Sequence, residues 1–241
     1  MIKNIKSCVA IAITAYFGLI SCTTPASIAQ SRYGLKVIDT KADYIKSVKL
    51  DSTKRMVALS NFIVPLNTDW RYAGSANFTG KVLYKKPLAC MRIEAAEALY
   101  RVNEELKQQH LGLKLFDSYR PYSVTMKMWE AVPDDRYAAN PAKGSGHNRG
   151  AAVDLTLYDL ETGAELPMPT PFDDFTEKAH HSYMQLDSVV LKNRKLLKTV
   201  MEKHGFVALD TEWWHYYLPN ATQRFELLDL DFNKMRKLLK Q

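Results

Sequence analysis

The sequence predicts an α+β fold, in which one compact domain has a small, mainly antiparallel sheet flanked by helices. Apolar residues recur every three or four positions over 87–110 and again over 186–204, which is the spacing of an amphipathic helix. Short strand-like stretches follow each of these segments. Two units of helix followed by short strands favour an α+β arrangement over a doubly wound parallel sheet.

The segment 87–110 is the clearest of the expected helices. Gly112 is placed to end it, and its apolar positions are Leu88, Met91, Ala95, Leu99, Val102 and Leu106. Residues 113–117 alternate between apolar and polar and predict a short strand. Pro121 then fits the first turn of a helix over 122–131, because the first turn of a helix does not need the N–H that proline lacks.

Turn-forming residues separate the remaining elements. We expect a loop over 133–146, a buried strand over 151–157, a turn-rich connection over 158–171, a helix over 186–204 stopped by Gly205, and short aromatic strands over 206–208 and 213–218. The last stretch, 222–241, predicts a basic amphipathic helix that either packs on the domain or lies near a membrane.

The N-terminus has the pattern of a bacterial lipoprotein signal. Lys3 and Lys6 precede an uncharged apolar stretch over 8–20, which is too short to span a bilayer comfortably. The sequence Leu-Ile-Ser-Cys at 19–22 resembles a lipobox, in which the cysteine becomes acylated. We therefore expect a signal peptide over 1–21, a tether over 22–32 and one domain over 33–241 with a helical C-terminal tail. An ordinary secretory signal or an uncleaved anchor, with Cys22 incidental, remains the alternative.

These features place the protein in the bacterial cell envelope, attached to a membrane through the lipid on Cys22. Thr23 follows the cysteine instead of an aspartate, which favours the outer membrane in a Gram-negative cell. Loss of Lys3 and Lys6 with the signal lowers the net charge from +7 to +5, and the remaining charges are scattered along the chain, so we expect no nucleic-acid partner. No obligate protein partner is evident. Cys90 is then the one cysteine in the domain and is expected to be inert core.

A small set of residues has the composition of a metal-dependent hydrolase site. His147 and Asp154 lie seven positions apart across Gly150, and His215 lies three positions after Glu212. Two histidines and one carboxylate are a ligand set for catalytic zinc, which leaves one coordination position for water. Glu212 is then an unligated carboxylate that can take a proton from that water. An extended 212–216 segment would point Glu212 and His215 to opposite faces, so a turn must bring them together.

Two longer motifs resemble a known peptidase family. Ser145 to Asp154 matches the SxHxxGxAxD motif of the D-Ala-D-Ala peptidases, and Glu212-Trp-Trp-His215 matches their ExWH motif. The similarity is closer to D-alanyl-D-alanine dipeptidases of the vancomycin-resistance type. It covers roughly residues 70–216 and includes Asn-Phe-Thr-Gly at 77–80, Asp-Ser-Tyr-Arg-Pro at 117–121, Asp-Leu-Thr-Leu-Tyr at 154–158, Phe-Asp at 172–173 and His-His at 180–181.

The resemblance implies a zinc dipeptidase with its metal site on the sheet and a small dipeptide as substrate. One Zn²⁺ per chain would be held by His147, Asp154 and His215. Glu212 would be the general base, and Arg120 would stabilise the oxyanion of the reaction. The remaining implied roles are substrate contacts, with the free ammonium at Asp173 and further contacts at Ser145 and Tyr72.

Other interpretations stay open from the sequence alone. The same fold serves carboxypeptidases and endopeptidases that cleave the stem peptides of peptidoglycan, and a zinc-binding envelope lipoprotein without turnover is a third class. Arg120 could pair with a surface carboxylate, and Asp173 could begin a turn. His180 and His181 could orient a ligand or lie on a surface loop. Residues 81–86 do not align with the family, which leaves the contact for the substrate carboxylate open.

Overall fold

The computed structural model describes residues 29–240. The expected signal peptide, Cys22 and residues 22–28 of the expected tether lie outside this range. The last residues of that tether are in a strand, because β1 (Ala29–Gln30) pairs antiparallel with β2 (Lys36–Ile38). Among the described residues, none of the helices has the length and apolar character needed to cross a membrane.

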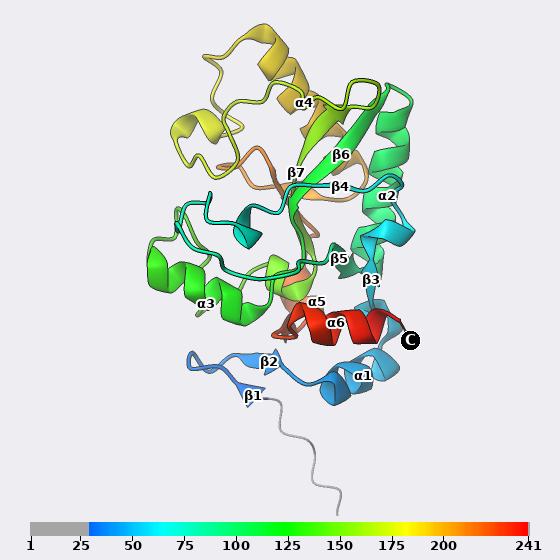
Figure 1. Ribbon diagram of the computed structural model, residues 1–241, viewed down its shortest axis with the longest axis vertical. Helices are drawn as coiled ribbons and strands as arrows, with labels where there is room; N and C mark the ends of the chain where they lie inside the picture. Colours follow the sequence, from blue (N-terminus) through cyan, green and yellow to red (C-terminus); the bar gives the residue numbers. More distant parts are fainter. Residues whose placement is uncertain (1–28, 241) are drawn as a thin grey trace, which may run out of the picture.

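A five-stranded sheet carries the centre of the fold (Figure 1). Its order is β4-β6-β7-β9-β8, and every neighbouring pair is antiparallel except β4 and β6. The strands are β4 (Asn67–Thr68), β6 (Leu111–Asp117), β7 (Ala152–Asp159), β9 (His215–Tyr217) and β8 (Val207–Ala208). The mainly antiparallel sheet predicted from the sequence is therefore confirmed.

Two small sheets attach the remaining strands. β3 (Met56–Ala58) pairs antiparallel with β5 (Cys90–Arg92). β10 (Leu227–Leu228) pairs parallel with β2, which joins the first and last parts of the described chain in one sheet with β1.

Helices flank the sheets as expected for an α+β domain. α2 contacts both β6 and α4, while α3 lies on another side of the central sheet (Figure 1). The helices are α1 (Lys41–Leu50), α2 (Ile93–Lys107), α3 (Tyr122–Ala131), α4 (Ser188–Lys203), α5 (Ala221–Arg224) and α6 (Phe232–Leu239). One large core cluster joins most of these elements and includes the buried Trp213, Trp214 and Tyr216.

The segment 87–110 departs from the expected single helix. Its first part is strand β5, and α2 begins only at Ile93. Cys90 is fully buried as expected, but it lies in this strand and not in a helix. Gly112 does not end the helix, because it lies inside β6, where a Cβ would come within 2.6 Å of the Tyr158 ring. The glycine there allows close approach of a neighbouring side chain.

The C-terminal stretch is also more divided than expected. Instead of one basic helix over 222–241, the chain forms the end of α5, then β10, then the eight residues of α6. Phe232, Met235 and Leu238 of α6 are buried in the main core. This helix therefore packs on the domain.

Candidate metal centre and active site

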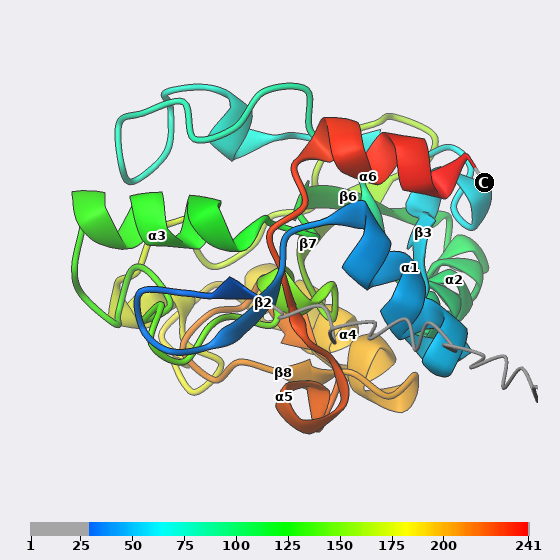
Figure 2. The ribbon, with the colours of Figure 1, turned by 90° about the horizontal axis from the view of Figure 1, so that it is seen from below.

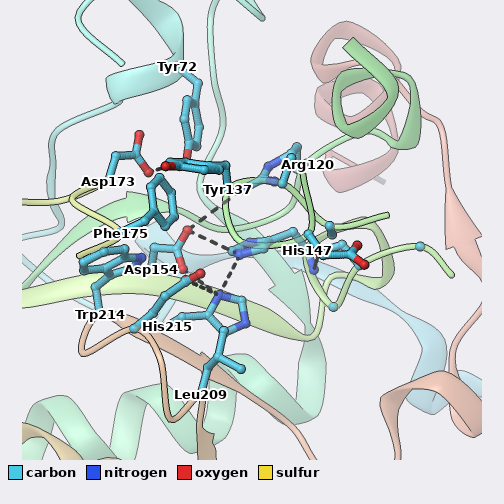
Figure 3. Close-up of a pocket in the computed structure, with 17 residues that line it drawn as sticks. Tyr72, Arg120, Tyr137, His147, Asp154, Asp173, Phe175, Leu209, Trp214 and His215 are labelled. Carbon is cyan, nitrogen blue, oxygen red and sulfur yellow. Dashed lines mark hydrogen bonds and ion pairs between the residues drawn. The ribbon is translucent and has the colours of Figure 1, made fainter. Parts of the chain in front are cut away.

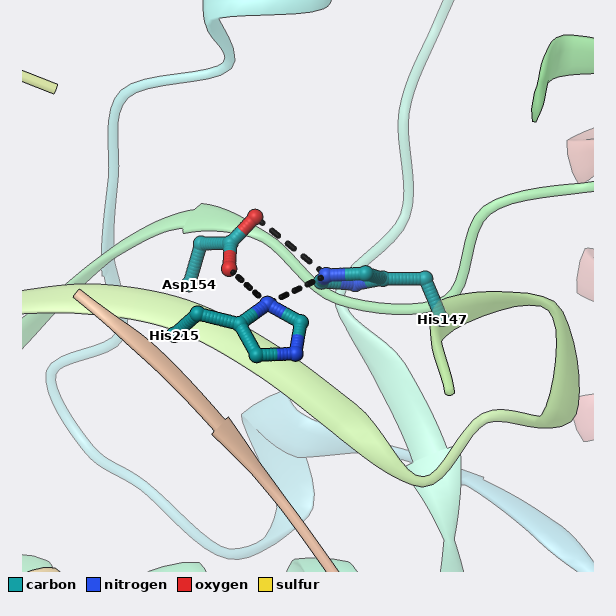
Figure 4. Close-up of side chains that lie close together, drawn as sticks. All are labelled: His147, Asp154 and His215. Carbon is teal, nitrogen blue, oxygen red and sulfur yellow. Dashed lines mark hydrogen bonds and ion pairs between the residues drawn. The ribbon is translucent and has the colours of Figure 1, made fainter. Parts of the chain in front are cut away.

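The three predicted ligands lie in or next to two neighbouring strands of the central sheet (Figure 4). Asp154 of β7 is the register partner of His215 of β9, so their side chains stand next to each other on one face. His147 opens a short 3-10 helix, His147–Arg149, that leads into β7. Gly150 follows this helix with φ +68°, a conformation that glycine adopts at little cost.

The ligand atoms of these side chains converge. His215 Nδ1 lies 2.8 Å from Asp154 Oδ1, and His147 Nε2 lies 3.2 Å from His215 Nδ1 and 3.3 Å from Asp154 Oδ2. All three residues offer ligand atoms within 4.8 Å of one another, and His147 and Asp154 are buried. Three atoms that can each offer a lone pair therefore face one point, which is the donor set of a divalent metal site.

A hydrogen bond fixes the orientation of the His147 ring. Its Nδ1 lies 2.7 Å from the carbonyl oxygen of Ser118, and a carbonyl can only accept, so Nδ1 carries the proton. Nε2 is then unprotonated and faces the cluster, as a metal ligand requires. Burial works against ionised Asp154, but the neighbouring His147 and His215 side chains outweigh burial and lower the pKa of this carboxyl. The residues present therefore fit zinc.

Glu212 reaches the cluster through a turn. The Leu209 N–H donates to the His215 carbonyl, and the Glu212 N–H donates back to the Leu209 carbonyl. This turn places Glu212 Oε2 4.0 Å from His215 Nδ1, so the two side chains meet although they are three residues apart. Burial raises the pKa of Glu212 to about 7, which suits a group that must accept and release a proton near neutral pH.

Arg120 is buried beside the same cluster. Its Nε donates to Asp117 Oδ2 at 2.7 Å, its Nη2 lies 3.9 Å from Asp154 Oδ2, and its guanidinium lies 5.1 Å from the centre of the Tyr72 ring. Burial disfavours the charged form, but the Asp117 carboxylate outweighs this and raises the pKa of Arg120. The alternative that Arg120 pairs with a surface carboxylate is therefore wrong, because the side chain is buried and charged inside the site.

Asp117 is a further site residue, for which the sequence predicted no role. It is fully buried, and besides Arg120 it accepts hydrogen bonds from the Tyr84 hydroxyl at 3.2 Å and the Ser118 N–H at 3.0 Å. It is also the register partner of Asp154 across β6 and β7. The spacing of three between Asp117 and Arg120 in the motif at 117–121 is the signal that could have indicated it.

Asp173 lies on the opposite side of the cavity from His147 (Figure 3). The Tyr72 hydroxyl donates to its Oδ1 at 2.9 Å, while its Oδ2 is buried with no hydrogen-bond partner among the described residues. Burial raises the pKa of Asp173 to about 7. The residue has φ +65°, so it does occupy a turn, but its carboxylate is directed into the site.

These groups line one cavity of about 310 Å³. Ser145 also lines it, and the Ser145 Oγ accepts a hydrogen bond from the His147 N–H at 3.1 Å. No pattern in the sequence indicates the aromatic wall formed by Tyr137, Phe175 and Trp214, whose neighbouring ring centres lie 5.0 and 5.9 Å apart. Tyr137 and Phe175 lie in irregular segments where no periodicity could reveal them.

A family model described as D-Ala-D-Ala dipeptidase, peptidase M15, matches residues 52–235. The chain belongs to this family. M15 peptidases are zinc metallopeptidases, in agreement with the His, Asp and His cluster. The match spans most of the domain and both ligand motifs.

Characterised M15 relatives are similar over most of their length. The D-alanyl-D-alanine dipeptidase of Escherichia coli K12 is 34% identical over 172 residues, which is 71% of this chain and 89% of the relative. That of Enterococcus faecium is 34% identical over 180 residues, which is 66% of this chain and 89% of the relative. Among solved structures, the LdcB LD-carboxypeptidase has a TM-score of 0.38 and 18% identity over 58% of this chain and 66% of its own.

The two histidines at 180 and 181 stand apart from this M15 site. Neither is among the residues that line the cavity. The His180 carbonyl accepts a hydrogen bond from Arg194, and the His181 N–H donates to the Asp210 carbonyl. Within residues 29–240 neither is hydrogen-bonded to a metal-ligand residue, so their contacts are structural.

Proposed function

We propose that this chain is a zinc dipeptidase that hydrolyses D-Ala-D-Ala and related D-containing dipeptides, with one Zn²⁺ per chain. His147 Nε2, Asp154 and His215 Nδ1 would hold the ion. When bound, zinc lowers the pKa of a water molecule to about 7 and polarises the scissile carbonyl. The protein's own side chains supply the rest of the chemistry.

Glu212 is the proton carrier. Its carboxylate lies at the edge of the ligand cluster, 4.0 Å from His215 Nδ1, and burial keeps its pKa near neutrality. In this position it takes a proton as water attacks the peptide carbon and delivers it to the leaving amine. Its raised basicity makes the first transfer favourable, and its proton is released easily in the second.

Arg120 stabilises the charge that develops on the peptide oxygen. Its guanidinium is held from behind by Asp117 and directs Nη2 toward the ligand cluster. A buried, fixed cation is effective for this purpose because it needs no reorganisation as the charge appears. Removing one such donor typically costs about a hundredfold or more in rate.

The unpartnered oxygen of Asp173 is the observation that supports a free dipeptide as the substrate. A free dipeptide brings an ammonium group that can pair with this buried carboxylate, while Tyr72 holds the other oxygen. An N-acylated peptide has no positive charge at its N-terminus and leaves the carboxylate buried and unpaired, which is energetically costly. Ser145 lines the same cavity and would be a further substrate contact.

Hydrolysis of free and N-acetylated D-Ala-D-Ala by the wild type and by Glu212→Gln tests the proposal. The wild type should cleave only the free dipeptide, and Glu212→Gln should bind zinc normally and lose turnover. Cleavage of the acetylated substrate would instead identify a stem-peptide carboxypeptidase. Undiminished hydrolysis by the variant would remove Glu212 from the mechanism, and zinc binding without any hydrolysis by the wild type would leave a non-catalytic zinc protein.

We also propose that the protein is an envelope lipoprotein, with signal peptide 1–21, a tether that begins at Cys22 and ends before β1, and the catalytic domain after it. The support is the lipobox-like sequence before Cys22, and Thr23 after it favours the outer membrane in a Gram-negative cell. In that compartment the enzyme would turn over dipeptide released from the wall. Cys22→Ser should release the protein from membrane fractions washed with about 1 M NaCl, which screens electrostatic attachment, and continued attachment after this wash would indicate an uncleaved anchor.

A further inference from the structure

The net positive charge of the domain is carried by the two ends of the described chain. Residues 29–61 contain seven Lys and Arg against three Asp and Glu, and residues 219–240 contain five against three. Together these segments have a net charge of +6. The much longer segment 62–218 contains nineteen basic and twenty acidic residues, a net charge of −1. Charges that look scattered along the sequence are therefore unevenly divided.

The fold brings the two basic segments together at one end of the molecule. β1, β2 and α1 lie beside α6 at the lower end in Figure 1, and α1 and α6 lie side by side when that end is viewed in Figure 2. β2 and β10 pair directly, and the Ser47 hydroxyl of α1 donates to Glu226 Oε1 at 3.0 Å. We define the basic end as residues 29–61 together with 219–240.

Most of the cations of the basic end are free to meet a partner. Within residues 29–240, seven of them are exposed and form neither an ion pair nor a side-chain hydrogen bond, namely Lys36, Lys41, Lys46, Lys49, Arg55, Lys237 and Lys240. Leu50, which follows Lys49 at the end of α1, is 81% exposed, the most of any large apolar side chain described. A mainly apolar groove of about 290 Å³ between α1 and α6 includes Lys49 and Arg55 in its lining.

We propose that the basic end docks on the surface of a bilayer that contains anionic phospholipids. Lysines and arginines near such a surface are each attracted by about 1 kcal/mol in favourable cases, and their long alkyl chains let apolar neighbours such as Leu50 approach the acyl region. Ala29, the first described residue, also lies at this end, in β1. A lipid on Cys22 would hold this same end near the membrane.

Docking in this way leaves the catalytic cavity free. None of the residues that line the cavity belongs to the basic end. The electrostatic contact would therefore orient the molecule on the bilayer and leave its active site unchanged. The inference depends on charge and exposure and not on the hydrolysis reaction, so it can fail while the proposed function holds.

Protection of lysines from acetylation tests the inference with the full-length protein. The protein is reconstituted with vesicles of phosphatidylcholine alone or mixed with phosphatidylglycerol, and acetylation by a membrane-impermeant reagent is followed for each peptide by mass spectrometry. Lys41, Lys46 and Lys49 should react more slowly only with phosphatidylglycerol present. The protection should disappear at about 1 M NaCl, where the Debye length is roughly 3 Å. Equal reactivity in the two vesicle types would overturn the proposal.

A pair of matched variants distinguishes an effect of the basic end from an effect of the net charge of the protein. Substituting Lys41, Lys46 and Lys49 by Gln should lower the ratio of docked to undocked protein on the order of a hundredfold, seen as lost protection of Lys237 and Lys240. The control substitutes Lys178, Lys192 and Lys195 by Gln, which are exposed residues outside the basic end, the last two in α4. The control should keep the protection, and both variants should hydrolyse free dipeptide normally. Equal loss in both variants would contradict docking through this end.

Discussion

The Tyr72 hydroxyl donates to one carboxylate oxygen of Asp173 at 2.9 Å and leaves the other oxygen buried without a partner among the described residues. Tyr72 in turn lies under the Arg120 guanidinium, so the two sides of the cavity are connected through this ring. A buried carboxylate with one free oxygen is unfavourable in the empty protein. A cationic group of the proposed substrate would pair with that oxygen and offset this cost.

Replacing Asp173 by Asn should impair the use of free dipeptides. Asn tolerates the left-handed backbone at this position, and its amide oxygen can still accept from Tyr72. The loss of the negative charge should lower kcat/KM for free D-Ala-D-Ala by about 30- to 150-fold, mostly through KM. Tyr72→Phe, which leaves the carboxylate in place, should cost much less. Steady-state kinetics of the two variants check this, and an unchanged KM in Asp173→Asn would contradict the role.

The same substitution should stabilise the metal-free protein in a pH-dependent manner. Burial raises the pKa of Asp173 to about 7, above the value of about 3.9 expected in the unfolded chain. Below about pH 4 the carboxyl is protonated in both the folded and the unfolded chain, so its burial costs no ionisation energy. As the pH rises toward 7, ionisation favours the unfolded chain and the free energy of unfolding falls. Asp173→Asn should match the wild type near pH 4 and exceed it at pH 8, by up to about 4 kcal/mol. Denaturant unfolding of both proteins at both pH values measures the difference in their free energies of unfolding. A difference that does not change with pH would refute the raised pKa of Asp173.

Asp117 is predicted to position Arg120. Asp117→Asn keeps an oxygen for the Ser118 N–H but weakens the bond that orients the guanidinium. We expect kcat to fall by about tenfold or more with little change in KM, because the charge that Arg120 is proposed to stabilise develops only in the transition state. Tyr84→Phe, which removes only the hydrogen bond from the Tyr84 hydroxyl to Asp117, should leave kcat nearly unchanged. A change confined to KM in Asp117→Asn would mean that Arg120 is only a binding contact.

The ligand residues were predictable because their signals are local in sequence. His147, Gly150 and Asp154 lie in one motif, and Glu212 and His215 lie in another. Their convergence is not visible in either motif, because it depends on the pairing of Asp154 with His215 across β7 and β9. A turn between Glu212 and His215 could be expected from the sequence, since alternating strand geometry alone would separate the two side chains.

The expected helix at 87–110 was wrong at its start for a physical reason. Cys90 and Met91 fit a helical apolar spacing, yet they form a strand because they pair with Ala58 and Val57. Pairing partners more than thirty residues away cannot be read from local periodicity, and tertiary contacts override weak propensities. The same limit applies to β10, whose pairing with β2 divides the C-terminal stretch.

Removal of the metal should abolish activity and lower stability. The three ligand atoms lie within 4.8 Å of one another, so without a cation their lone pairs are poorly compensated. Metal analysis should find one zinc per chain, and zinc at a thousandfold excess over its Kd should stabilise the chelated protein by about 4 kcal/mol. His215→Ala should lose both the zinc and the shift in Tm. A Tm shift that persists in this variant would place the ion elsewhere.

Gly150→Ala should destabilise the protein more than an ordinary glycine substitution does. Gly150 has φ +68°, and a Cβ there would lie 2.5 Å from the Met56 sulfur, so the variant combines backbone strain with a clash. We expect a loss of about 2–4 kcal/mol in the free energy of unfolding. Gly163 is the matched control, because it has φ +73° and an added Cβ there would meet nothing within 4 Å, so Gly163→Ala should cost only about 1 kcal/mol.

Because the Gly150 N–H donates to the His147 carbonyl, Gly150→Ala should also weaken zinc binding, whereas Gly163→Ala should not. Equal costs in the two variants, measured by denaturant unfolding, would show that Met56 yields to the added methyl group and that the His147 turn does not depend on this glycine.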